Sequence, residues 1–320
     1  MRNRRCAVDK RLRQLIRGDK RVIAQTITTV ENATDPKVLE QIFPHTGKAY
    51  HIGITGPPGA GKSTLVNVLC QHLLTDGKKI GIIAVDPTSP FSGGALLGDR
   101  VRMTDLSLHK DVYIRSMGSR GSLGGLAQKT KDVALVLDAA GMDYVFIETI
   151  GVGQVELDIA QVCDTTVVVL VPESGDSIQA MKAGLLEIAD ILVVNKGDRE
   201  GSDRFMLELK FAFELREQVT GWDFPILKTI ATKPEGIPEL GAAIAAHRSY
   251  LEGCGMLEKA RKIKLKRRIH ELIENRISSH LREHMIGEHE LDTMLDKMYR
   301  RKLNPFRVAA RIADRIIRPQ

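Results

Sequence analysis

The sequence predicts an α/β fold, a doubly wound and mostly parallel sheet that carries a P-loop and has helical extensions at both ends. Between residues 48 and 253, short apolar runs alternate with helical patterns. Most of these runs are continuously apolar, which is typical of parallel strands buried on both faces. A glycine-rich loop directly follows the first run. The expected strands are Tyr50–Thr55, Ile80–Val85, Val112–Ser116, Tyr144–Thr149, Thr166–Val171, Ile191–Asn195 and Ile226–Ala231.

The loop after the first expected strand reads G-x-x-x-x-G-K-S, the pattern that binds phosphate. Its glycines let successive backbone N–H groups point at phosphate oxygens, and the following helix adds the partial positive charge of its N-terminus. Lys62 would contact the β- and γ-phosphates and stabilise charge during hydrolysis, and the Ser63 hydroxyl would bind Mg²⁺. The residues expected to hold the nucleotide here are Gly56, Pro57, Pro58, Gly59, Ala60, Gly61, Lys62, Ser63 and Thr64.

Helical patterns fill the segments between the strands and both ends of the chain. We expect a helical N-terminal extension over residues 1–47 and a helical C-terminal arm over residues 254–320, whose last helix begins at Asn304-Pro305. The apolar faces of the C-terminal helices are narrow, so they should pack on the sheet domain or on another copy of the chain. The helices expected between strands include Gly125–Ala140, Ile178–Ile188 and Arg204–Val219.

Charge and composition limit the possible partners. The 320 residues carry a net charge of +7, with +5 over residues 1–43, +8 over residues 256–320 and an acidic centre. The basic ends could bind an anionic partner, but an aromatic content of 4% offers few rings for stacking on bases, and solvated helix faces explain the charge more simply. The four cysteines are scattered, and no apolar run suits a secretory signal or a membrane span. We expect a cytoplasmic protein that binds neither nucleic acid nor membranes.

The end of the sixth expected strand carries a candidate base-binding motif, Asn195-Lys196-Gly197-Asp198. The Asp198 carboxylate can accept hydrogen bonds from N1–H and the 2-amino group of guanine, a donor pair that adenine does not offer. Asn195 and Lys196 would brace the loop and cover the base. A helix-capping aspartate in an ordinary turn is the alternative. A weaker second base loop is expected at Ile230, Ala231 and Thr232, where the usual first residue would be Ser.

Carboxylates near the phosphate loop are candidates for the metal site, because Mg²⁺ prefers hard oxygen ligands. Asp86 ends the second expected strand, Glu148 ends the fourth, and Asp99 lies in a Gly-rich segment. With Ser63 they form the expected metal set, and Glu148 could also position the attacking water. Gly151 follows in Glu148-Thr149-Ile150-Gly151. Its N–H could bind the γ-phosphate, which would make Gly151–Glu156 a switch that responds to the nucleotide state.

Together these motifs resemble one family, the MeaB-like or ArgK-like G-protein chaperones of adenosylcobalamin-dependent acyl-CoA mutases, which are the methylmalonyl-CoA mutase-associated GTPases. The resemblance spans residues 52–198 in the expected order, and the helical extensions also suit the family. The matching runs are GPPGAGKST, VDPTSPFSGGALLGDRVRM, SRGSLGGLA, ETIGVGQVE, LVPESGD and NKGD.

The resemblance implies a GTPase whose GTP or GDP state gates adenosylcobalamin loading and protects a mutase such as methylmalonyl-CoA mutase. It implies Mg²⁺-dependent hydrolysis that the partner stimulates, and a homodimer formed through the C-terminal helices. It also implies a third switch at Glu173–Lys182, where Asp176 and Lys182 fall at the positions of partner-responsive catalytic residues. The departures from the family pattern are Ser122, Gly197 and Ile230, where His, Ala and Ser are usual.

Two other functions remain as alternatives. A P-loop kinase or ATPase linked to amino-acid transport should prefer ATP, which the motif ending in Asp198 argues against. A nickel-insertion GTPase should carry a His-rich tail or a Cys-His cluster. The histidines are dispersed, and the nearest approach to a cluster is His280, His284 and His289, for which a solvated helix face is the simpler interpretation.

Overall fold

The computed structural model describes residues 10–32, 37–86, 103–118, 123–149, 158–172, 184–214, 221–284 and 288–310. The chain divides into two compact units, Met1–Ala260 and Arg261–Gln320. The division therefore falls inside helix α12 (Met256–His284), a few residues beyond the boundary at 253/254 that the sequence suggested. Each unit is described by itself.

The first unit is built on a seven-stranded sheet in the order β3-β2-β4-β1-β5-β6-β7, and every strand pair is parallel. The predicted α/β fold with a doubly wound parallel sheet is confirmed. The last strand is shorter than expected, because Ile230 leaves the sheet and forms an isolated antiparallel bridge with Glu235. The strands are β1 (Tyr50–Thr55), β2 (Ile80–Asp86), β3 (Val112–Gly118), β4 (Tyr144–Thr149), β5 (Thr165–Leu170), β6 (Ile191–Val194) and β7 (Ile226–Lys228).

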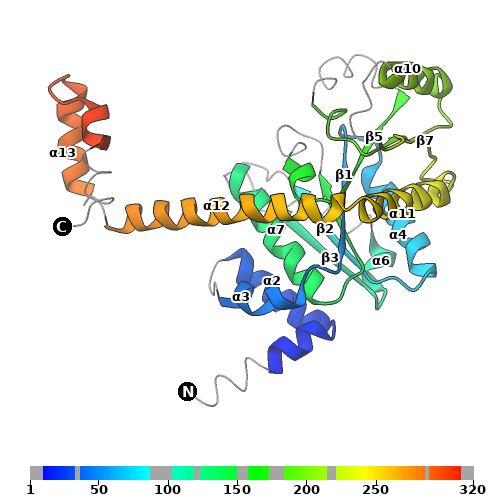
Figure 1. The fold of residues 1–320 in the computed structure, drawn as a ribbon, viewed down its shortest axis with the longest axis horizontal. Helices are drawn as coiled ribbons and strands as arrows, with labels where there is room; N and C mark the ends of the chain where they lie inside the picture. The colour runs from blue at the N-terminus through cyan, green and yellow to red at the C-terminus, as the bar shows by residue number, and fades with distance from the viewer. Residues whose placement is uncertain are drawn as a thin grey trace. The chain divides into compact units, whose positions relative to one another are not determined.

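Helices cover both faces of the sheet (Figure 1). In β5, Val167 and Val169 belong to a core cluster shared with α4 and α11, whereas Val168 and Leu170 belong to a cluster shared with α10. This alternation shows that both faces are buried, which is why the strands read as continuous apolar runs. The described helices of this unit are α2 (Lys20–Glu31), α3 (Lys37–Ile42), α4 (Lys62–Thr75), α6 (Thr104–Leu108), α7 (Leu123–Ala139), α10 (Ser202–Glu214) and α11 (Ile237–Gly253), with short 3-10 turns η1 (Phe43–His45) and η2 (Ile159–Gln161).

The N-terminal helices share the core of the sheet. Asp19 caps α2, since its carboxylate accepts hydrogen bonds from the backbone N–H groups of Arg21 and Val22. Ile23 and Ile27 of α2 are fully buried and belong to the same cluster as α7 and strands β2 and β4. Figure 1 shows α2 and α3 beside α7, and the helical character expected for this part of the chain is present.

One predicted helix is wrong over its described part. Residues 184–188 of the expected helix Ile178–Ile188 form a turn, in which the N–H of Glu187 donates to the carbonyl of Gly184; the remainder lies outside the described residues. Leu185 is buried against β5, β6 and α10, so the apolar spacing reflects a packed turn and not a helix face. The expected helix Arg204–Val219 corresponds to α10, which ends at Glu214.

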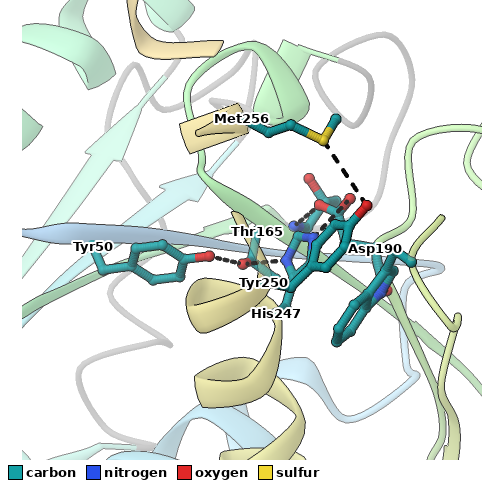
Figure 2. Close-up of polar contacts among 8 residues, drawn as sticks. Tyr50, Thr165, Asp190, His247, Tyr250 and Met256 are labelled. Atoms are coloured by element: carbon teal, nitrogen blue, oxygen red, sulfur yellow. Dashed lines mark hydrogen bonds and ion pairs between the residues drawn. The ribbon is translucent and has the colours of Figure 1, made fainter. Parts of the chain in front are cut away.

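Helix α11 is fixed to the edge of the sheet where the strands begin, opposite the phosphate loop. Figure 2 shows the contacts, in which the Thr165 hydroxyl lies 2.6 Å from the Tyr50 hydroxyl and 2.9 Å from Nδ1 of His247. The other ring nitrogen of His247 lies 3.7 Å from a carboxylate oxygen of Asp190. Burial lowers the pKa of His247 to about 4, against an opposing effect of Asp164, and so His247 is neutral at physiological pH.

The second unit consists of α12 from residue 261, α13 (Glu288–Tyr299) and a helix that covers residues 305–310. Asn304 caps this last helix, because its side-chain oxygen accepts from the N–H groups of Phe306 and Arg307, and the helix start expected at Asn304-Pro305 is confirmed. A row of half-exposed apolar side chains lies along α12: Ile263, Ile269, Leu272, Ile273 and Ile277, each 46–53% exposed. Along the described ranges, no helix combines the length and apolar character needed to cross a bilayer.

Candidate nucleotide-binding site

The phosphate loop joins β1 to α4 and needs glycine at two of its turns. Gly56 has φ 139°, and a Cβ there would lie 2.0 Å from the carbonyl oxygen of Val169 in β5. Gly61 has φ 86°, and a Cβ there would lie 2.5 Å from the side-chain nitrogen of Asn195. A side chain would therefore collide with the backbone of β5 at residue 56 and with the Asn195 side chain at residue 61. These constraints hold the loop at the carboxyl edge of the sheet, with Pro58 and Gly59 exposed at its tip.

Lys62 begins helix α4 and is only 5% exposed. Its ammonium group donates hydrogen bonds to the carbonyls of Gly56 and Pro57, each at 2.8 Å. A buried cation is tolerated because these carbonyls replace its hydration. The positive charge is thereby held inside the curve of the loop, at the N-terminus of α4, where a phosphate would bind.

Ser63 and Glu148 bring two hard oxygens together beside this loop. The Ser63 hydroxyl donates to Oε1 of Glu148 at 2.5 Å. Glu148 is 2% exposed and lies in β4 between Ile54 of β1 and Ala84 of β2. A hydroxyl and a carboxylate are ligands that suit Mg²⁺, so this pair fits such an ion.

The other candidate metal ligands are less fully described. Asp86 is the last residue of β2 and pairs through its backbone with Gly118 of β3, at the same edge of the sheet as Glu148. Asp99 lies outside the described residues, as do Gly151, Asp176 and Lys182. The described side chains include no group of three or more His, Cys, Asp or Glu residues that could hold a metal ion by themselves.

Asn195 connects the candidate base loop to the phosphate loop. It is 2% exposed and directly follows β6. Its side-chain nitrogen donates to the carbonyl of Ala60 at 2.8 Å. Its side-chain oxygen accepts from the Thr229 hydroxyl at 3.1 Å and from the N–H of Ala231 at 3.2 Å. One side chain thus fixes three loops relative to one another. Thr229 was not predicted from the sequence, because its only signal is a polar side chain at the end of an apolar strand.

The remaining candidate base-binding residues lie around Asn195. Lys196 has φ 57°, a left-handed conformation that turns the chain sharply after β6. Asp198 follows in this turn and is exposed, so its carboxylate is accessible to a ligand. On the second base loop, Ile230 is buried, Ala231 is tied to Asn195, and Thr232 is exposed. The structure therefore places both base loops at the same edge of the sheet as the phosphate loop.

A parallel α/β sheet with this phosphate loop and a base loop at its carboxyl edge defines the class of P-loop GTPases. The chain belongs to the family of methylmalonyl Co-A mutase-associated GTPase MeaB, whose model matches residues 23–286. The predicted family and its GTPase activity are thereby confirmed.

Several relatives support this assignment along most of the chain. A protein of Pyrococcus abyssi is 44% identical over 315 residues, which are 97% of each chain. The GTPase ArgK of Escherichia coli is 35% identical over 281 residues, 84% of this chain and 85% of its own. The mouse protein described as methylmalonic aciduria type A homolog, mitochondrial, is 32% identical over 322 residues, 94% of this chain and 78% of its own. A crystal structure described as a LAO/AO transport system kinase covers 98% of each chain with a TM-score of 0.73 and 26% identity.

Proposed function

We propose that this GTPase is a chaperone of an adenosylcobalamin-dependent acyl-CoA mutase such as methylmalonyl-CoA mutase. Its GTP or GDP state would gate cofactor loading and protect the mutase from inactivation. Support for the partner comes from the family, which is described as mutase-associated, and from the mouse relative, whose name refers to methylmalonic aciduria. The observation that carries the nucleotide chemistry is the Ser63–Glu148 contact beside the phosphate loop.

In this proposal the phosphate loop and Lys62 bind the β- and γ-phosphates. The Lys62 ammonium is already oriented by two loop carbonyls, so it can neutralise charge that develops on the transferred phosphoryl group without a large reorganisation. Mg²⁺, when bound, would add positive charge at the β- and γ-phosphates, held by Ser63 with Glu148, Asp86 and Asp99 as further candidate ligands. Glu148 would also orient the attacking water.

Guanine would be selected by Asp198 on the loop that Asn195 fixes, with Lys196 and the second base loop around the ring. Asn195 forms hydrogen bonds with both the phosphate loop and the second base loop. The loops that would bind the base and the phosphates are therefore joined to one another. Gly151, Asp176 and Lys182 are proposed to act in the switches that respond to the γ-phosphate and to the mutase.

The C-terminal helices are proposed to form a homodimer. The half-exposed apolar side chains of α12 recur on a helix that is otherwise strongly charged, which is the pattern of a helix that packs on a partner helix. A second copy of the chain would bury them. Among the described residues, the cysteines Cys70, Cys163 and Cys254 are free thiols, which suits a reducing compartment. We propose that the protein acts in the cytoplasm.

Two measurements test this proposal. Titration calorimetry with GDP and ADP should show a clear preference for GDP; equal or tighter binding of ADP would favour the transport-linked kinase suggested by the name of the similar crystal structure. Size-exclusion chromatography with an adenosylcobalamin-dependent acyl-CoA mutase should show co-elution that depends on whether GTP or GDP is bound. Separate elution in every nucleotide state would contradict the chaperone role.

A further inference from the structure

Gly197, the third residue of the base loop, is held from two sides through its backbone. Its N–H donates to the carbonyl of Thr229 at 2.9 Å, and its carbonyl accepts from the hydroxyl of Ser202, a buried residue at the start of α10, at 2.8 Å. Asp198, the residue proposed to bind guanine, comes next in the chain. The position of the Asp198 carboxylate therefore depends on how firmly Gly197 is held.

Lys228 of β7 covers a third side of Gly197. A Cβ at Gly197 would lie 2.6 Å from Cγ, 2.8 Å from Cε and 3.2 Å from Cδ of Lys228. The lysine stem thus occupies the space that a side chain at residue 197 would need. The Lys228 ammonium is drawn away from the base loop to Asp203 in the first turn of α10, at 2.7 Å.

The charge and the methylene stem of Lys228 differ in how much they contribute to this contact. The ion pair with Asp203 is largely in solvent, because the two side chains are 37% and 84% exposed, and an exposed pair of this kind contributes little. The methylene stem instead packs on the buried Gly197, and packing of such a stem is a role separate from its charge. What Lys228 does at this loop should therefore depend mainly on its stem.

We propose that Lys228 is a positioning residue for guanine, and that it acts by packing its stem on Gly197 so that Asp198 keeps one orientation. This inference rests on the proposed placement of guanine at Asp198. The long stem of Lys228 then fits against residue 197 because residue 197 has no side chain. A methyl group at residue 197 and the Lys228 stem cannot occupy the present positions together.

The test compares matched variants by titration calorimetry with GDP and by steady-state GTP hydrolysis. Lys228→Ala should weaken GDP binding about 10-fold and raise KM for GTP while kcat is retained. Lys228→Met keeps the stem without the charge and should bind GDP like the unsubstituted protein, as should Asp203→Asn. Thermal unfolding midpoints of all variants separate a local effect from a loss of fold.

A double-mutant cycle supplies the decisive comparison. Gly197→Ala as a single substitution should weaken GDP binding. When Lys228→Ala is already present, adding Gly197→Ala should weaken GDP binding no further. Wild-type GDP affinity in Lys228→Ala, additive effects in the double variant, or an equal loss in Lys228→Met would each overturn the inference. Failure of the proposed function looks different, since the unsubstituted protein would then show no preference for GDP over ADP.

Discussion

The hydroxyl of Ser63 and the carboxylate of Glu148 meet at 2.5 Å, although they are 85 residues apart in the chain. Ser63 lies in the first turn of α4, and Glu148 lies in β4, the strand beside β1. The contact exists because the sheet places β4 between β1 and β2, so that its carboxyl end reaches the start of the helix that follows β1. This arrangement brings two candidate oxygen ligands together at the start of α4, where Lys62 is also buried.

Substitutions of this pair should separate hydrolysis from nucleotide binding. Ser63→Ala and Glu148→Gln should each lower the rate of GTP hydrolysis by about 10²–10³-fold, because each removes a group expected to hold Mg²⁺ or orient water. The Mg²⁺ concentration for half-maximal activity should rise in both. GDP affinity measured in EDTA serves as the control and should stay within a few-fold of the unsubstituted value. Hydrolysis and Mg²⁺ dependence that remain unchanged in both variants would remove this pair from the site.

The identity of the base should follow from Asp198. Asp198→Asn replaces an acceptor by a side chain that can also donate, so guanine loses one of its two hydrogen bonds, whereas xanthine offers a carbonyl at the position of the guanine amine. We expect GDP binding to weaken by at least about 10²-fold and binding of xanthosine diphosphate to improve. Competition titrations with both nucleotides measure this exchange. If the variant keeps its preference for GDP over xanthosine diphosphate, Asp198 is not the residue that recognises the base.

His247 should make folding stability depend on pH. Its pKa is about 4 in the folded protein against an ordinary 6.5, so on acidification the unfolded chain takes up the proton first. The stabilisation is therefore complete above about pH 6.5 and is lost as the pH falls towards 4, with a total of roughly 3 kcal/mol. Denaturant unfolding between pH 4 and 7 measures this slope. In His247→Gln, whose side chain does not titrate, the free energy of unfolding should change less with pH across that window. The same pH dependence in both proteins would show that His247 is not its source.

The apolar row on α12 predicts the oligomeric state. Ile269→Glu combined with Ile273→Glu places charges among side chains that are about half exposed in a single chain. If a second copy buries them, the variant should be monomeric, because an unpaired charge in an apolar interface costs several kcal/mol. Analytical ultracentrifugation of both proteins reports the state. Ser278→Glu is the control, since it adds a charge on the same helix but lies about 140° around the helix axis from Ile273 and about 180° from Ile269. Identical masses for the parent and the double variant would exclude this interface.

The fold could be predicted largely because its signals are local. Each strand is a short apolar run, and the P-loop pattern fixes a strand, a turn and a helix within a few residues of Gly56. The expected helix over Ile178–Ile188 shows the limit of such signals, because the spacing of apolar residues also suits a turn whose Leu185 packs on the sheet. Periodicity alone does not distinguish these cases.

The site could be predicted less completely, because its strongest contacts join distant parts of the chain. Asn195 was expected to brace its own loop, but its bond to Ala60 spans 135 residues and depends on the order of β1, β5 and β6 in the sheet. The packing of Lys228 on Gly197 has no motif at all, since a lysine in a strand usually indicates only a solvated edge. Such contacts follow from tertiary packing, which local sequence patterns do not reveal.

If a mutase controls the nucleotide cycle of this chain, as we propose, it should change the rate of GTP hydrolysis. The most direct measurement is the rate of GTP hydrolysis at saturating GTP and Mg²⁺, with and without an adenosylcobalamin-dependent acyl-CoA mutase in its apo and cofactor-loaded forms. We expect slow hydrolysis by the chain alone and faster hydrolysis with the partner, with no acceleration in Glu148→Gln. Hydrolysis at the same rate in the presence and absence of every such mutase would rule out control by the partner.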